Sequence, residues 1–224
     1  DETPTDWKDK YREGYAYRKF VRTREHLVGL DGVESTKHVA QSVVRKSAFL
    51  QYITLTRRYA KVKIRDYTGT GVLLSQAPIL GIAMWIVFPH PDIATMFMMV
   101  LSVLWFGASD SVRELIAERT IWRREARVGL KLMPYMLSKL TVLGVLVSIQ
   151  CLMLVGIVYW SLDMASYGYS FWALSGVAIG TGWVGLSMGL LVSSIFSSSE
   201  AAVGTLPLLL IPQIAFGGLI VKLK

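Results

Sequence analysis

The chain has 224 residues, of which 53% are hydrophobic, yet it carries a formal net charge of +8. Of its 24 lysines and arginines, 15 lie in residues 1–69, seven in residues 113–139 and two at the C-terminal end. A polytopic membrane protein with basic cytoplasmic loops shows this partition, whereas a nucleic-acid-binding protein would carry its basic face within a soluble domain. The composition therefore predicts an integral membrane protein and argues against nucleic acid as a partner.

Residues 1–44 are polar, mixed in charge and without a sustained apolar period, which predicts a cytoplasmic linker. The polar opening DETPTDWKDKYREG has no initiator Met and no signal peptide, so we expect a piece of a longer polypeptide.

Residues 45–67 are predicted to form an amphipathic helix in the lipid headgroup region. Apolar and aromatic residues recur there at spacings of three and four, and basic residues line a second face. The alternative is a soluble helix packed on a neighbouring domain, because amphipathicity alone does not distinguish lipid from protein. The apolar face is Phe49, Tyr52, Leu55, Tyr59 and Val62, and the basic face is Arg57, Lys61 and Arg65.

Five hydrophobic runs follow, at residues 70–88, 93–110, 141–162, 171–196 and 201–221. Each approaches or exceeds the roughly 17 to 20 residues that a helix needs to cross the hydrocarbon core. The fold class predicted is therefore an all-α membrane protein with five transmembrane helices in residues 70–224. Alternation of the loops and the excess of basic residues place the N-terminus in the cytoplasm.

The long charged segment between spans two and three, residues 113–139, is predicted to be helical. Its three stacked arginines would repel one another, so groups outside the helix must supply the counter-charges. We interpret the segment as a cytoplasmic coupling loop that takes force from a partner. One face carries Glu114, Glu118, Trp122 and Glu125, and another carries Arg119, Arg123 and Arg127.

Residues Gly180 to Gly185 match the dinucleotide pattern G-x-G-x-x-G, but they lie inside a hydrophobic helix instead of following a strand. We interpret these glycines as helix-packing residues. The pairs Gly176–Gly180 and Gly185–Gly189 have the spacing that allows close approach of backbones, either within the subunit or across a dimer.

Catalytic and metal-binding patterns are absent from the sequence. No P-loop lysine exists, and the three histidines lack metal-ligand spacing, so we expect no metal and no cofactor in this segment. The spans carry no central charge, which argues against ion-coupled transport.

The central loop resembles the intracellular loop of ABC exporters with the type-2 permease fold, known as the G-subfamily or White-like fold. Similar residues are Glu118-Arg119, Arg123-Arg124-Glu125, Gly129 and Tyr135. Upstream, Gln51, Arg58, Arg65 and Asp66 resemble the connecting helix of that family, and residues 216–221 resemble the end of its fifth span. Residues 7–21 are similar to the linker of bacterial proteins that fuse a forkhead-associated domain, an ATPase domain and this permease.

This resemblance implies six spans in the complete permease, of which this chain carries five, and ATP with Mg²⁺ on an attached or partner ATPase domain. It also implies a dimer, most simply a homodimer, in the bacterial inner membrane. An apolar cavity would favour hydrophobic or amphipathic cargo. The segment itself has no ATPase site, whereas the complete transporter would be an ATP-hydrolysing translocase.

The resemblance also assigns site residues. Coupling to the ATPase domain is assigned to Glu114, Glu118, Arg119, Trp122, Arg123, Arg124 and Glu125. The substrate cavity is assigned to Val100, Leu104, Trp105, Gly107, Leu210, Ile211 and Ile214, and an outer plug to Leu219 and Ile220. The alternative is a membrane-anchored scaffold or signalling protein with a basic, lipid-binding juxtamembrane region. An ion channel is a more distant alternative, since no charged or carbonyl-lined filter is visible.

Overall fold

The computed structural model describes residues 4–15, 17–22 and 47–216, and the chain divides into two compact units, Asp1–Arg45 and Lys46–Lys224. The predicted plug residues Leu219 and Ile220 lie outside the described residues. In the first unit, helix α1 (Pro4–Glu13) is followed by a short π-helix, η1 (Tyr17–Arg22). The segment predicted to be a linker thus contains helical structure, and its role as a linker stays a prediction.

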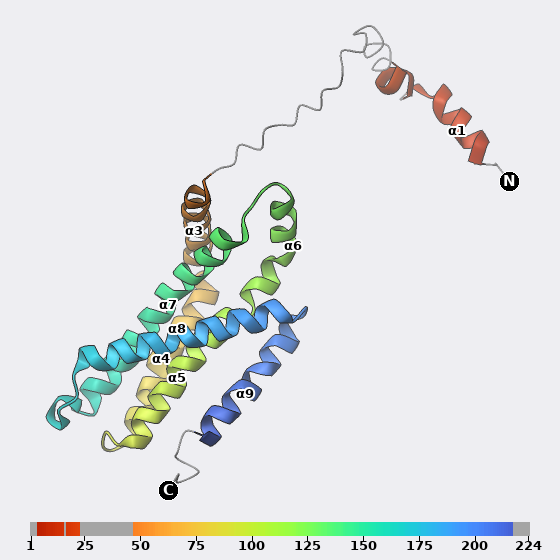
Figure 1. The fold of residues 1–224 in the computed structure, drawn as a ribbon. Helices are drawn as coiled ribbons and strands as arrows, with labels where there is room; N and C mark the ends of the chain where they lie inside the picture. The colour runs from red at the N-terminus through yellow and green to blue at the C-terminus, as the bar shows by residue number, and fades with distance from the viewer. Residues whose placement is uncertain (1–3, 16, 23–46, 217–224) are drawn as a thin grey trace. The chain divides into compact units, whose positions relative to one another are not determined.

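The second unit is built of helices, and none of its described residues forms a strand, which confirms the all-α class (Figure 1). The long helices are α3 (Ala48–Arg65), α4 (Tyr67–Val87), α5 (Ile93–Ser111), α6 (Glu114–Arg127), α7 (Leu132–Ser161), α8 (Phe171–Ile195) and α9 (Ser199–Phe216). A short 3₁₀ helix, η2 (Met164–Tyr167), joins α7 to α8.

Four helical stretches are long and apolar enough to cross a membrane: Tyr67–Val87, Ile93–Arg127, Leu132–Ser161 and Phe171–Ile195. They correspond to the first four predicted spans. The fifth prediction, residues 201–221, is not confirmed as a span, because the apolar part of α9 that the structure describes is shorter, Ser199–Ala215. The chain is therefore an integral membrane protein with four candidate spans among its described residues.

The start of α5 follows from local chemistry. Asp92 caps α5: its carboxylate accepts from the backbone N–H of Thr95 at 2.8 Å, and the Thr95 hydroxyl accepts in return from the Asp92 N–H. These hydrogen bonds favour the ionised form and lower the pKa of Asp92. Helix α7 begins at Leu132, so the last part of the predicted coupling loop belongs to the helix of the third span.

Helix α3 packs along α7; its buried residues are Leu55 and Tyr59, and the Tyr59 ring meets Lys139 of α7. Phe49 and Val62, on the same predicted apolar face, are 67% and 57% exposed. Part of this face therefore contacts the chain's own third span, and only the remainder is available to lipid or to another protein.

Helices α5 and α8 cross so closely that only glycine fits at the crossing. A Cβ atom on Gly107 would lie 2.1 Å from the carbonyl oxygen of Gly182, and one on Gly185 would lie 2.3 Å from that of Leu104. A Cβ atom on Gly189 would lie 2.4 Å from a carbonyl oxygen of α5. The Gly185–Gly189 pair thus packs within the subunit, as small residues do between membrane helices.

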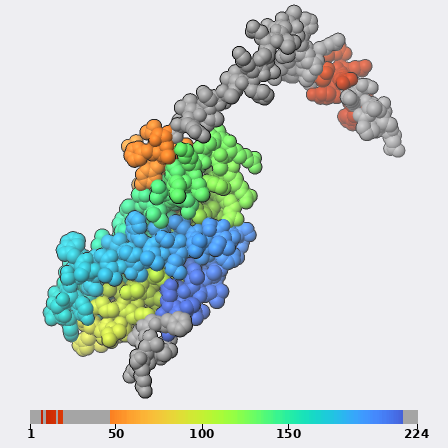
Figure 2. All heavy atoms as spheres, in the orientation of Figure 1, coloured from red at the N-terminus to blue at the C-terminus, as the bar shows by residue number. Residues whose placement is uncertain are grey.

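The apolar core lies around α7, whose Leu143, Val147, Leu154 and Val155 are fully buried against the neighbouring helices. Figure 2 shows α8 running across one face of this unit, with α9 beside its later half. Helix α6 has no buried residue, and it meets the core through Leu115 and Ile116 and through polar contacts.

Candidate functional site

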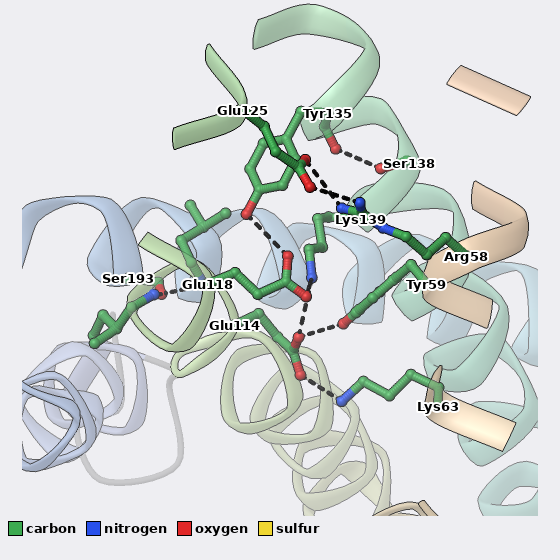
Figure 3. A network of polar contacts seen from close by, with 12 residues as sticks. Arg58, Tyr59, Lys63, Glu114, Glu118, Glu125, Tyr135, Ser138, Lys139 and Ser193 are labelled. Carbon is green, nitrogen blue, oxygen red and sulfur yellow. Dashed lines mark hydrogen bonds and ion pairs between the residues drawn. The ribbon is translucent and has the colours of Figure 1, made fainter. Parts of the chain in front are cut away.

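The inward face of α6 carries carboxylates that bind basic and phenolic groups of α3 and α7 (Figure 3). Glu114 accepts hydrogen bonds from the Tyr59 hydroxyl and from the Lys63 ammonium group, and lies 3.6 Å from the Lys139 Nζ. The burial of Tyr59, reinforced by the negative charge of Glu114, raises the pKa of its phenol. Glu114 therefore ties α6 to both α3 and α7.

Glu118, one turn later, completes the same cluster. Its Oε1 lies 2.6 Å from the Nζ of Lys139, and its Oε2 accepts from the Tyr135 hydroxyl at 3.3 Å. The Lys139 side chain is only 1% exposed, and its ammonium nitrogen also lies 3.4 Å from the centroid of the Tyr59 ring. A buried ammonium needs such partners, because an isolated charge pays a large desolvation cost.

At the far end of α6, Arg58 of α3 makes a bidentate ion pair with Glu125, with N–O distances of 2.7 and 3.2 Å. This hydrogen bonding raises the pKa of Arg58. The Gln51 side chain donates to the Gly129 carbonyl at 3.3 Å and accepts from the Lys131 N–H at 3.2 Å. Two of the predicted connecting-helix residues, Arg58 and Gln51, thus hold α6 and the turn after it.

The other two connecting-helix predictions lie at the end of α3. The Asp66 carboxylate accepts from the Gly69 N–H at 2.9 Å and caps α4, and Arg65 is exposed. Neither residue contacts α6 by a hydrogen bond or ion pair among the described residues.

Helix α6 is also attached to the end of α8. Arg119 donates to the carbonyl oxygens of Ser193, Ser194 and Phe196, the last at 2.6 Å. Carbonyls at a helix C-terminus lack intrahelical partners and attract positive charge. In return, the Ser193 hydroxyl accepts from the Leu115 N–H at 3.0 Å and from the Ile116 N–H at 3.3 Å, near the start of α6.

The remaining coupling predictions lie on other faces of α6. Arg124 is exposed on the outward face, together with Thr120 and Arg127, and the structure gives these two arginines no hydrogen bond or ion pair within its described part. Trp122 and Arg123 lie on a third face, beside a groove between α6 and α7. The predicted coupling residues thus divide between internal anchors and surface groups.

The residues predicted for a substrate cavity lie in several environments. Val100 lines a groove of about 450 Å³ between α5 and α8. Leu104 is buried, Trp105 is half-buried and Gly107 lies at the α5–α8 crossing. On α9, Leu210 and Ile214 are half-buried and Ile211 is exposed. The assignment of these residues to a substrate cavity stays a prediction.

Sequence reasoning missed several members of the cluster. Tyr59 and Lys63 are spaced by four residues on α3, and this spacing could have indicated a common face toward a carboxylate. Lys139 precedes a predicted span and gave no signal of burial. Apart from this cluster, Asp110 of α5 is only 4% exposed, and neither of its carboxylate oxygens has a hydrogen-bond partner among the described residues.

The counter-charges expected for this segment come partly from the chain itself. The carboxylates bind Arg58, Lys63 and Lys139 of the same subunit. Arg119 binds carbonyl oxygens instead of carboxylates. Among the described residues of the segment, the exposed cations that remain available to groups from elsewhere include Arg123, Arg124, Arg127 and Lys131. We therefore expect a partner to act on the outer surface of this segment.

Comparison with known proteins gives the chain a family. The family model described as ABC-2 type transporter matches residues 50–224. A similar protein is the "ABC transporter ATP-binding/permease protein Rv1747" of Mycobacterium tuberculosis, 32% identical over 119 residues, 46% of this chain and 14% of that protein. No solved structure matches. Since the family match includes every helix from α4 to α9 and most of α3, the chain belongs to the ABC-2 type transporter family of membrane proteins.

Proposed function

We propose that this chain is the permease part of an ATP-driven exporter, and that α6 carries motion from an ATPase domain to the spans. The observation that carries the proposal is the division of α6 into faces: its carboxylates are held inside the subunit, while Arg124 and Arg127 are exposed. An exposed basic face on a rigidly held helix suits contact with an acidic surface.

The attachments of α6 explain how a push on it would spread. Glu114 and Glu118 join it to α3 and α7, and Arg119 joins it to α8. A displacement of α6 would therefore act on α3, α7 and α8 together. Such a connected element can bias two packing states of the spans when a nucleotide favours one of them.

The ATPase domain, with ATP and Mg²⁺, is either fused to this chain or a separate subunit. A fused arrangement is supported by the printed name of the mycobacterial relative, an ATP-binding/permease protein, of whose length the chain covers 14%. We further propose a dimer in the bacterial inner membrane with the N-terminus in the cytoplasm. A hydrophobic or amphipathic cargo suits the apolar groove beside Val100.

The test is ATP hydrolysis by the complete transporter reconstituted in lipid vesicles. Arg124→Glu with Arg127→Glu reverses the exposed charges and is expected to lower hydrolysis at least tenfold, with nucleotide binding preserved. The matched control is Lys61→Glu with Arg57→Glu, which reverses two exposed charges on α3. Equal activity of the two double variants would contradict the proposal.

A further inference from the structure

The third face of α6 borders a groove of about 420 Å³, and Arg119 is the one lining residue that the coupling proposal uses. Its lining combines two kinds of surface. Arg119 and Arg123 supply guanidinium groups, and most of the remainder is apolar. The apolar and aromatic lining comes from Leu115, Trp122, Leu132, Tyr135 and Met136. A basic end joined to an apolar surface is complementary to an amphipathic anion.

The polar groups of this groove have unused hydrogen-bonding capacity. The Trp122 indole nitrogen is buried and has no hydrogen-bond partner among the described residues. An indole N–H is a donor only, so it requires an acceptor. Arg123 is exposed and makes no ion pair within the described part of the chain. Arg119 uses one terminal nitrogen, Nη2, for the α8 carbonyls. The two arginines therefore offer donors to an oxyanion in the groove and no acceptor, whereas protein atoms cover the Trp122 nitrogen.

The end of the groove nearest the membrane lies at the depth of lipid headgroups. Helix α7 has 30 residues, which at about 1.5 Å per residue is longer than the hydrocarbon core of about 30 Å. Trp160, near its far end, is 74% exposed and suits a membrane interface. About 20 residues from Trp160 cross the core, which places Met136 about 6 Å beyond it, within the opposite headgroup layer.

We propose that this groove binds one anionic phospholipid. The phosphate accepts hydrogen bonds from Arg123 and from the free part of the Arg119 guanidinium, and an acyl chain runs toward the hydrocarbon core along Leu115 and Met136. The inference is independent of nucleotide and goes beyond the proposed coupling role, because it concerns a different face of α6 from Arg124. The bound lipid would fill the space between α6 and α7.

The test is native mass spectrometry of the complete transporter titrated with dioleoylphosphatidylglycerol in detergent. Arg123→Gln is expected to weaken binding of the first lipid about fivefold, as loss of one basic contact near a membrane surface does. The matched control is Arg124→Gln, which removes the same charge one residue away on the outward face and is expected to leave this affinity unchanged.

Four results would overturn the proposal. Equal weakening of lipid binding by Arg123→Gln and Arg124→Gln would mean unspecific electrostatic attraction. Equal affinity for dioleoylphosphatidylcholine would mean that the groove does not select a negatively charged lipid. Displacement of the lipid by glycerol 3-phosphate at equal concentration would mean a site for a soluble phosphate. If Arg123→Gln instead releases the ATPase domain and leaves lipid binding intact, the groove holds protein. Failure of the coupling role would appear separately, as loss of hydrolysis in the Arg124 and Arg127 variants only.

Discussion

Lys139 and Glu118 form an ion pair of 2.6 Å in which the lysine side chain is 1% exposed. The pair joins the start of the third span to the middle of α6, so it connects the apolar core to the charged surface. Lys139 also lies 3.6 Å from Glu114, which makes it the shared cation of two carboxylates. Several consequences of this arrangement can be measured.

Removing the shared cation should destabilise the fold strongly. Lys139→Met leaves Glu114 and Glu118 without their buried cation, and breaking a buried pair from one side typically costs about 3 to 5 kcal/mol. Thermal unfolding in detergent measures the effect. The double variant Lys139→Met with Glu118→Gln removes both charges and should recover part of the loss. An unchanged melting temperature for Lys139→Met would show that the ion pair carries no stability.

The ion pair between Arg58 and Glu125 should contribute much less. Its side chains are 50% and 28% exposed, so solvent screens the attraction, and a double-mutant cycle should give a coupling of about 0.2 to 1 kcal/mol. The coupling should fall further in high salt. A value equal to that of the Lys139 cluster would mean that the pair is shielded from water in the complete protein.

The close crossing of α5 and α8 should not tolerate a side chain. Gly185→Ala places a Cβ atom 2.3 Å from the Leu104 carbonyl and should cost about 1 to 3 kcal/mol. The matched control is Gly180→Ala on the same helix, where a Cβ atom meets nothing within 4 Å. The control should be neutral or stabilising by up to about 1 kcal/mol. Greater destabilisation by Gly180→Ala would place that glycine in a contact with another subunit.

Stability should depend on the ionisation of Tyr59 at alkaline pH. Burial, followed by the charge of Glu114, raises the pKa of Tyr59 above its ordinary value of 10.0. The folded state therefore retains this proton longer than the unfolded state. The associated stability is fully present below about pH 10 and is lost as the pH rises above it. Chemical unfolding at pH 8 to 11 should show a shallower decline for Tyr59→Phe, and parallel curves would contradict the assignment.

The sequence predicted the apolar helices well because hydrophobic runs are a local property. The charged faces of α6 were also predictable from residue spacing. The start of α7 was not predicted, since residues 113–139 were expected to form one charged helical segment and the third span was expected to begin at residue 141. Proline is tolerated in the first turn of a helix, where N–H groups have no intrahelical partner, and Lys139 is buried because it binds α6.

Contacts between distant residues were the part that the sequence could not predict. Arg119 binds the end of α8, more than 70 residues later, and Ser193 returns bonds to the start of α6. No local pattern specifies which arginine finds carbonyl groups and which stays exposed. The spacing of Arg119, Arg123 and Arg127 predicted one face, whereas the packing of α8 and α7 gives them different surroundings.

The proposed role of α6 requires that its outward face contacts an ATPase domain and moves with it. Photocross-linking of the complete transporter measures this contact. A benzophenone amino acid is placed at Thr120 or Arg124 and, as the matched control, at the exposed Arg57 of α3. We predict cross-links to the ATPase domain from both α6 positions, with yields that change between nucleotide-free and ATP-bound protein, and none from Arg57. Absence of α6 cross-links, or yields that ignore the nucleotide, would contradict the coupling account.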